Sequence, residues 1–226
     1  MKVAVVGEHQ LMDLVKYYAA RAGEYDNVYL KPERQDEIKR LAAMLRNSLS
    51  GHRILEIACG TGFWTERIAT AAKSITASDI NDEVLAIAGK RLRGFANVSL
   101  RRGDAYCLED VGSKHSAGLA AFWWSHVPKG RLAVFLDMFE SRLEPCAVVV
   151  FTDNCYVKGN MHPITRTDNE GNTYQTRRLD GGAEHEVLKN FPSREEIRSC
   201  LEERGTNVEY EFLTYYWMAS YRLNPR

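Results

Sequence analysis

The sequence predicts an α/β fold, in which helices cover both faces of a mostly parallel sheet. From residue 53 onward, short apolar runs typical of strands alternate with segments of helical periodicity, as a parallel sheet requires. Residues 54–65 run through a buried strand, a tight turn with two glycines and the start of a helix. A second apolar run, residues 75–80, carries an acid nineteen positions after Gly60. These observations indicate a nucleotide-like cofactor at one edge of the sheet.

The glycine turn and two acids indicate how such a cofactor is held. Gly60 and Gly62 carry no Cβ, so the backbone can turn sharply and come close to a ligand. Asp79, at the end of the second strand, suits acceptance from two ribose hydroxyls. Residues 98–105 form a third strand that ends in Gly-Asp-Ala. This ending predicts a carboxylate next to the place where an adenine amino group would lie.

In this order and at these intervals, the three motifs resemble those of the class I S-adenosylmethionine-dependent methyltransferases, over roughly residues 14–152. The resemblance implies a Rossmann-like sheet of seven strands, mostly parallel, with an antiparallel last strand. It also implies S-adenosylmethionine as cofactor and S-adenosylhomocysteine as product. The loop at residues 58–62 would hold the methionyl part, and Ile80 would pack on the adenine. The expected cofactor-binding residues are Tyr18, Glu56, Ala58, Gly60, Gly62, Asp79, Ile80, Gly103, Asp104, Ala105 and Phe122.

Composition indicates one domain without a nucleic-acid partner. The 226 residues are enough to bury a full core, and 30 basic residues balance 30 acidic ones. A balanced chain lacks the basic field that docking to nucleic acid usually needs. The densest basic run, with four arginines between residues 91 and 102, is interpreted as a solvated face around the third strand.

Cysteine spacing and hydropathy exclude further classes of protein. The five cysteines are scattered and show no C-x-x-C spacing, which supports neither a metal site nor a disulfide framework. Cys59 lies inside the cofactor loop and is interpreted as packing. No run approaches about 20 apolar residues, so no membrane span is expected. We therefore expect a soluble, cytoplasmic protein.

Four segments are expected within the single methyltransferase domain of residues 1–226. They are an N-terminal helical lid at 1–50, a cofactor-binding core at 51–152, an inserted substrate or lid hairpin at 153–190, and a closing helix and hairpin at 191–226.

The lid is expected from helical patterns at residues 11–18 and 38–49 and from tyrosines between them. Part of this stretch resembles a segment that folds over the cofactor in many small-molecule methyltransferases, on the residues Tyr18, Ala22, Tyr25 and Asp26. On this resemblance, Tyr18 and Tyr25 close the site over the sulfonium. The alternative is that these tyrosines merely cover the edge of the sheet.

Residues 153–190 do not fit the plain core. Two strand-like runs, residues 173–179 and 183–188, flank a glycine turn and predict a hairpin. Function usually sits on loops above the carboxyl ends of parallel strands, so we expect the hairpin to be a lid or a substrate wall. The alternative is a dimer contact, and the protein is expected to be a monomer or a homodimer.

Acceptor chemistry is expected after the fourth strand, in residues 122–128. His126 is the only histidine near that point, and its pKa range suits a general base at neutral pH. The alternative is that His126 caps the helix opened by Pro128. The expected substrate-binding residues are aromatic with a few polar groups: Tyr25, Trp123, Trp124, Asn154, Tyr156 and Tyr216. An anionic group could be recognised by His162, His185, Arg166 and Arg177, although such residues more often lie at the surface.

The leading hypothesis is methyl transfer from S-adenosylmethionine to an oxygen, nitrogen or sulfur atom of a small metabolite. The alternatives are a protein or RNA methyltransferase of the same fold and a non-catalytic cofactor-binding subunit. A nicotinamide-dependent oxidoreductase is disfavoured, because Thr65 stands where the dinucleotide fingerprint needs its third glycine. No cluster of metal ligands is apparent, so no metal is expected.

Overall fold

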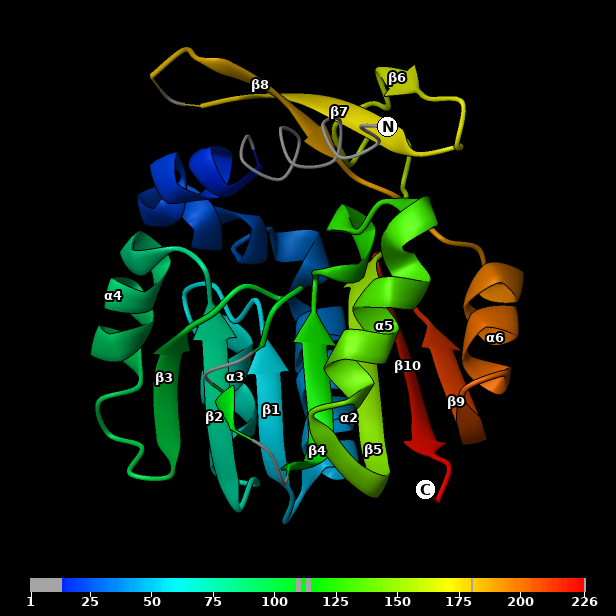
Figure 1. The fold of residues 1–226 in the computed structure, drawn as a ribbon. Helices are drawn as coiled ribbons and strands as arrows, with labels where there is room; N and C mark the ends of the chain where they lie inside the picture. Colours follow the sequence, from blue (N-terminus) through cyan, green and yellow to red (C-terminus); the bar gives the residue numbers. More distant parts are fainter. Residues whose placement is uncertain (1–13, 109–110, 113–114, 180, 226) are drawn as a thin grey trace, which may run out of the picture.

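The computed structural model describes residues 14–108, 111–112, 115–179 and 181–225. Among these residues, the main sheet has seven strands in the order β3–β2–β1–β4–β5–β10–β9 (Figure 1). The pairs among β1 to β5 are parallel, whereas β10 runs antiparallel to β5 and β9. The strands are β1 (Arg53–Ile57), β2 (Ser74–Asp79), β3 (Val98–Arg102), β4 (His115–Ala121), β5 (Leu143–Asn154), β9 (Gly205–Phe212) and β10 (Tyr216–Leu223). The fold expected from the sequence is therefore confirmed.

Helices cover both faces of this sheet, because its strands send apolar side chains alternately into two cores. In β1, Leu55 enters the core under α5 and α6, whereas Ile54 enters the core under α2 and α3. The helices are α2 (Gln35–Leu49), α3 (Phe63–Ala69), α4 (Asp82–Arg91), α5 (Leu132–Glu140) and α6 (Arg194–Glu202). Short 3-10 turns are η1 (Ala22–Tyr29), η2 (Pro32–Arg34), η4 (Trp124–His126) and η5 (Lys129–Arg131).

A glycine in the central strand β4 lets α5 lie directly on the sheet. A Cβ on Gly118 would come within 2.7 Å of the ring of Phe139 and 2.9 Å of Leu143. Atoms in a close-packed interior do not approach that closely, so a larger residue would push the helix away. The contact fixes α5 against β4, and the loop between them carries His126.

A second sheet lies above the carboxyl ends of the parallel strands, in the order β6–β7–β8 (Figure 1). Its strands are β6 (Arg166–Thr167), β7 (Thr173–Arg178) and β8 (Glu184–Leu188). The hairpin predicted within the insertion is present as the antiparallel pair β7–β8, which places Tyr174 opposite Leu188. The insertion therefore roofs the edge of the main sheet at which the cofactor is expected.

The N-terminal segment divides into two parts that lie in different places. Residues 14–20 are helical and lead into η1, which lies above the strands and contacts α4 (Figure 1). In contrast, α2 packs on a face of the sheet, with Leu41 fully buried. Thus only the part before α2 lies over the carboxyl edge, a shorter stretch than the lid expected at 1–50. Residues 11–13 of the helical pattern lie outside the described residues.

Candidate active site

The turn between β1 and α3 depends on left-handed backbone conformations. The φ angles of Ala58, Gly60 and Gly62 are 50°, 55° and 74°. A Cβ on Gly62 would lie 2.9 Å from Leu92, so glycine lets the turn pack closely at this point. A Cβ on Gly60 would meet the ring of Tyr25 at 3.8 Å. Gly60 thus faces the N-terminal segment, and Gly62 faces the protein interior.

Asp79 ends β2 beside this turn and holds its backbone in place. One carboxylate oxygen accepts from the N–H of Gly60 at 2.9 Å, and the other accepts from the N–H of Asn81 at 3.0 Å. Burial raises the pKa of Asp79, whereas these backbone hydrogen bonds act to lower it. Each oxygen has a further lone-pair site, so the carboxylate can also accept from a ligand.

A cavity, called here the first cavity, opens between this turn, the ends of β2 and β3 and the N-terminal segment. Most residues predicted to bind cofactor or substrate line it: Tyr18, Tyr25, Ala58, Gly60, Asp79, Ile80, Gly103, Asp104, Ala105, Phe122, Trp123 and His126. Four further lining residues were not predicted: Leu14, Val15, Asn81 and Val84. The apolar position of Val84, one turn after the second acidic strand end, is a signal that could have identified it.

Two predicted cofactor residues lie outside the lining of this cavity. Glu56 is only 1% exposed within β1, and burial raises its pKa to about 8. Gly62 packs towards Leu92 behind the turn. Glu56 and Gly62 therefore belong to the framework of the turn and not to its open side.

A second cavity, of about 370 Å³, adjoins the first. The two cavities share the side chains of Tyr18, Tyr25, Phe122 and His126. The N-terminal segment and the insertion supply most of the remaining wall, and the ends of β5 and β10 contribute Asn154 and Tyr216. The structure thus brings predicted substrate residues next to the predicted cofactor residues.

His126 stands between the two cavities and is held at both ring nitrogens. Its Nδ1 lies 2.7 Å from the carbonyl oxygen of Leu188, which can only accept, so Nδ1 carries the proton. In the neutral ring, Nε2 then accepts from the hydroxyl of Tyr18 at 2.8 Å. Neither partner belongs to the helical turn that follows Pro128, and no described side chain caps η5 or α5. Capping of that helix, the alternative considered for His126, is therefore not the role of this side chain.

Both members of the Tyr18–His126 pair are neutral at pH 7. Burial, followed by the nearby charges of Lys189 and Arg177, holds the pKa of His126 well below its usual range. Burial raises the pKa of Tyr18, although the charge of Arg177 opposes this shift. The pair is thus a fixed, uncharged hydrogen-bonding unit between the cavities, and His126 is a weaker base than a free histidine.

Two of the predicted substrate residues lie elsewhere. Trp124 is 4% exposed and packs edge-on against Phe151 and Trp217 in the core, although its neighbour Trp123 lines the first cavity. The 3-10 turn η4 sends these adjacent tryptophans into different surroundings, which their sequence alone did not indicate. Tyr156 is 38% exposed and rests beside Phe191, outside both cavities.

Basic side chains gather around the second cavity to an extent that the sequence did not indicate. They are Arg21, Lys31, Arg34, Arg177 and Lys189. Of the four residues considered for an anionic group, Arg177 and His162 line this cavity. Arg166 instead pairs with Glu186 at an exposed position, and His185 lies against the ring of Tyr17.

Asp26 ties the N-terminal segment to the glycine turn. Its carboxylate accepts from the hydroxyl of Thr61 at 2.6 Å and pairs with Arg91 of α4. Arg91 also donates to the carbonyl oxygen of Thr61 at 2.8 Å. Asp26 therefore joins η1, the turn and α4 into one hydrogen-bonded unit beside the first cavity.

Within the part of the chain that the structure describes, no helix is long and apolar enough to cross a membrane. In the same residues, no three His, Cys, Asp or Glu side chains gather as ligands for a metal ion.

Comparison with known proteins adds to these observations. Residues 54–146 match a family model described as a methyltransferase domain. The DhpI–SAH complex is 29% identical to this chain with a TM-score of 0.78, over 96% of this chain and 98% of that chain. A DhpI–SAM–HEP complex is 28% identical with a TM-score of 0.75, over 93% and 96%. The N-methyltransferase NodS from Bradyrhizobium japonicum WM9, solved with S-adenosyl-L-homocysteine, shares the fold at 16% identity with a TM-score of 0.65, over 93% and 98%. No curated protein matches the chain.

The cofactor assignment fits the chemistry of the first cavity. The carboxylate of Asp79 faces it from a strand end, and Ile80 and Val84 give it an apolar wall. The two DhpI structures were solved with S-adenosylmethionine or its demethylated product. The matched methyltransferase domain and the two DhpI complexes therefore support an S-adenosylmethionine-dependent methyltransferase, with S-adenosylmethionine as its cofactor.

Proposed function

We propose that this enzyme methylates an oxygen, nitrogen or sulfur atom of a small organic acceptor held in the second cavity. The observation that carries the proposal is the junction of the two cavities at Tyr18, Tyr25, Phe122 and His126. A volume of about 370 Å³ suits a small molecule. The insertion and the N-terminal segment both wall this space, which favours an enclosed acceptor over a nucleic acid or protein lying across the surface.

In this proposal, the cofactor lies in the first cavity with its methyl group towards the second. Asp79 accepts from the ribose hydroxyls, Ile80 packs on the adenine, and Asp104 accepts from the adenine amino group. The loop at residues 58–62 lies along the methionyl part. When bound, S-adenosylmethionine supplies a methyl group on a positively charged sulfur, and the protein has to align an acceptor atom in line with it.

Tyr18 and His126 are proposed to orient the acceptor. The Tyr18 hydroxyl donates to His126 at 2.8 Å, so its oxygen lone pairs remain available to accept from an acceptor hydroxyl or amine. A proton leaving such a group would pass through Tyr18 to Nε2 of His126. Because the pKa of His126 is low, this route is weak, and alignment is the main contribution of the pair.

The test is a transfer assay with S-adenosylmethionine labelled in its methyl group. The protein is incubated separately with a pool of small organic compounds, with total RNA and with a protein mixture, and Asp79→Ala serves as the inactive control. The proposal predicts label in the small-molecule pool alone. Label confined to RNA or protein would instead assign a macromolecular acceptor. Cofactor binding without label in any fraction would indicate a non-catalytic subunit.

A further inference from the structure

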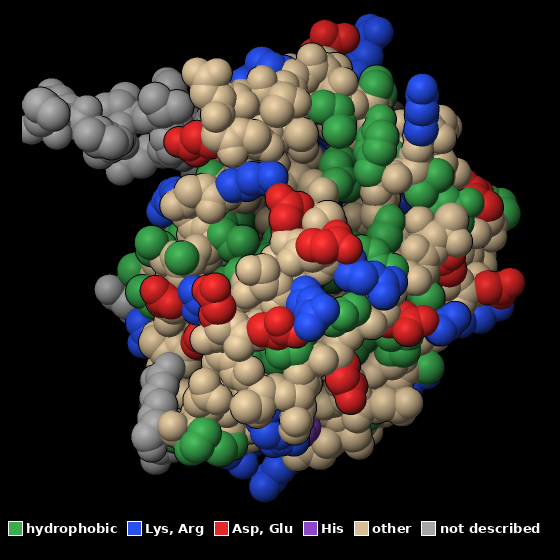
Figure 2. All heavy atoms as spheres, turned by 90° about the vertical axis from the view of Figure 1, so that its right-hand side faces the viewer, with side chains coloured by type: hydrophobic (Ala, Val, Ile, Leu, Met, Phe, Trp, Pro, Cys, Tyr) green, Lys and Arg blue, Asp and Glu red, His purple; other side chains and the backbone are tan. Residues whose placement is uncertain are grey.

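The second cavity concentrates positive charge in a protein that is neutral as a whole. The full chain has 30 basic and 30 acidic residues, and the two kinds are interspersed over the face shown in Figure 2. Five basic side chains nevertheless line this cavity, and none of the described residues lining it is an aspartate or glutamate. Such a separation of charge inside a cleft focuses a positive potential on whatever enters it.

Only one of these five cations has a carboxylate partner among the described residues. Lys189 pairs with Asp153 at 2.9 Å, and both side chains are almost completely buried. Arg34 bonds to the carbonyl and amide oxygens of Asn160, which are neutral acceptors. Arg177 donates to the amide oxygen of Gln175 at 2.9 Å. A charge that is taken out of water without an opposite charge is costly, so these arginines are poised for an anion.

Some residues in the wall of the second cavity also have buried polar atoms without a hydrogen-bond partner. Arg34 and Arg177 are only 5% and 8% exposed, and the Nε atom of each is buried without a hydrogen-bond partner. The hydroxyl of Tyr216, a residue 1% exposed, is also buried without a partner, and its ring lies 6.0 Å from the Arg34 guanidinium. Buried polar groups are normally satisfied. These three donors come from three segments around the cavity, and the described residues of the protein supply no acceptor for them.

The basic residues of this wall lower the pKa values of two neighbouring histidines. Burial first, and then the charges of Arg177, Arg21 and Lys31, lower the pKa of His162. Arg177 and Arg21 also act on His126 in the same direction. The positive potential therefore extends across the cavity to the residue that borders the first cavity.

We propose that the acceptor is a small organic anion, whose carboxylate or phosphate group is held by Arg34 and Arg177, with Arg21 and Lys31 adding to the positive potential. This inference rests on the proposed function, because it assigns the chemical class of the acceptor. A guanidinium matches the planar arrangement of two oxyanion oxygens and retains its charge at every accessible pH. The same wall repels a protonated amine, so cationic amines are excluded as acceptors.

The first experiment measures anion binding directly. Phosphate, sulfate and acetate are titrated into the protein saturated with S-adenosylhomocysteine, with methylammonium as the cationic counterpart. At least one anion should bind with a Kd of about 10 mM or lower, and methylammonium should not bind. Arg34→Gln and Arg177→Gln should each weaken anion binding by about tenfold or more and leave S-adenosylhomocysteine affinity unchanged.

Arg166→Gln is the matched control, because Arg166 belongs to the same insertion but pairs with Glu186 outside the cavity. It should leave anion binding unchanged. Retained affinity for S-adenosylhomocysteine shows that a variant is folded, so a loss in Arg34→Gln or Arg177→Gln reports on the cavity. The absence of anion binding to the unaltered protein, or equal binding by these two variants, would overturn the inference.

The second experiment separates the inference from the proposed function. The labelled-methyl assay is repeated with compounds sorted into carboxylic acids, phosphate monoesters, neutral alcohols and amines. Label in either acidic class supports the inference, and the class that is labelled distinguishes a carboxylate from a phosphate. Label only in neutral compounds or amines would overturn the anion assignment while leaving small-molecule methylation intact. Transfer to RNA or protein alone would overturn both.

Discussion

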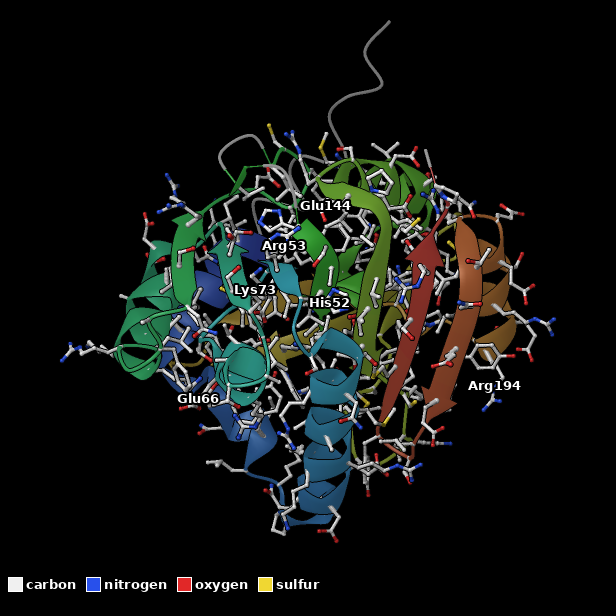
Figure 3. The ribbon with its side chains drawn as sticks, turned by 90° about the horizontal axis from the view of Figure 1, so that it is seen from below. His52, Arg53, Glu66, Lys73, Glu144 and Arg194 are labelled. Atoms are coloured by element: carbon white, nitrogen blue, oxygen red, sulfur yellow. The ribbon has the colours of Figure 1, made fainter. Side chains whose placement is uncertain are left out.

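An arginine at the amino edge of the main sheet has a carboxylate partner, whereas two buried arginines at its carboxyl edge have none among the residues that the structure describes. At the amino edge, the Arg53 guanidinium donates to both carboxylate oxygens of Glu144 at 2.7 and 2.8 Å, and Figure 3 shows the two beside one another. At the carboxyl edge, Arg34 and Arg177 line a cavity and meet only neutral acceptors. The protein thus neutralises Arg53 with a carboxylate, whereas no described carboxylate neutralises the charges of Arg34 and Arg177 beside the second cavity.

Exposure makes this contrast informative about function. The side chains of Arg53 and Glu144 are 39% and 34% exposed, so water screens them and their attraction contributes little to stability. Arg34 and Arg177 are buried, where an uncompensated charge destabilises the folded protein. Buried charges that destabilise the folded protein are typical of functional sites. The two arginines therefore indicate that the functional site lies at the carboxyl edge of the sheet.

The largest expected effect follows a change of His126 at the carboxyl edge. In His126→Asn, the side-chain amide can still donate to Leu188, but the acceptor for the Tyr18 hydroxyl is lost. Because a misplaced acceptor typically costs about a hundredfold, we expect kcat to fall by about that factor, with cofactor affinity within a factor of a few. His52→Asn, which alters a histidine at the amino edge (Figure 3), should leave kcat unchanged. Near-normal turnover of His126→Asn would show that His126 does not help to align the acceptor.

The next effect concerns cofactor affinity. Asp79→Ala removes the carboxylate that holds the N–H groups of Gly60 and Asn81 and faces the first cavity. Affinity for S-adenosylmethionine should fall by about 1.5–3 kcal/mol, the range for hydrogen bonds to a charged group. Calorimetric titration of the folded variant measures this loss. Unchanged affinity would contradict the ribose assignment.

A smaller effect is expected where the N-terminal segment meets the turn. Asp26→Ala removes the acceptor shared by Thr61 and Arg91. If η1 closes over the cofactor, its amides should gain hydrogen-exchange protection when S-adenosylhomocysteine binds to the unaltered protein, and should gain less in the variant. The amides of β1 serve as an internal reference. Equal exchange with and without ligand would make η1 a fixed cover of the sheet edge.

The pH dependence of stability distinguishes the histidines at the two edges. Burial lowers the pKa of both His126 and His52 in the folded protein, and the shift is much larger for His126. Below about pH 6.5, the unfolded chain takes up protons that the folded protein does not bind. Stability contributed by the neutral rings is therefore present above that pH and is lost as the pH falls, at up to about 1.4 kcal/mol per pH unit for each ring.

Chemical denaturation between pH 7.5 and 5 measures this slope. His126→Asn should flatten the dependence more than His52→Asn does. In the unaltered enzyme, the rate should also remain level through pH 6.5, since His126 stays neutral there. Equal flattening by the two variants would contradict the difference in environment between the two edges.

The smallest effect is expected at the amino edge itself. Glu144→Ala removes the partner of Arg53, and both side chains are partly exposed. The free energy of unfolding should fall by at most about 1 kcal/mol, and cofactor and anion binding should not change. Urea titration measures the free energy of unfolding, and calorimetry measures the affinities for cofactor and anion. A loss of ligand affinity would show that the two edges are coupled through the sheet.

Much of the fold and of the lining of the first cavity could be predicted, because each signal lies within a short stretch of sequence. The glycine turn at residues 58–62 follows β1, Asp79 ends β2 and Asp104 lies just after β3, and parallel strands bring their carboxyl ends to one edge. In contrast, Trp124 was assigned to the substrate wall because nothing in the sequence distinguishes it from Trp123. The 3-10 turn that separates them is a matter of tertiary packing.

The wall of the second cavity was the least predictable part. Arg34 and Lys189 are far apart in the chain and line one cavity only because the insertion folds back over the N-terminal segment. The bond between His126 and the carbonyl of Leu188 spans 62 positions and likewise has no local pattern. Basic residues on such segments look like ordinary surface residues until the fold places them around one space.

The location of the insertion has a consequence for how this enzyme can change over evolution. The glycine turn and the acidic strand ends belong to the main sheet and its connections. Much of the second cavity instead belongs to the segment 159–189, whose described residues form no strand of that sheet. Substitutions in this stretch can alter the shape and charge of the acceptor wall without disturbing the residues around the methyl donor. New acceptors are therefore accessible through variation in one inserted segment. A mutant library confined to residues 159–163, Gln175 and Arg177, which leaves Leu188 and Lys189 in place, is the shortest route to altered specificity.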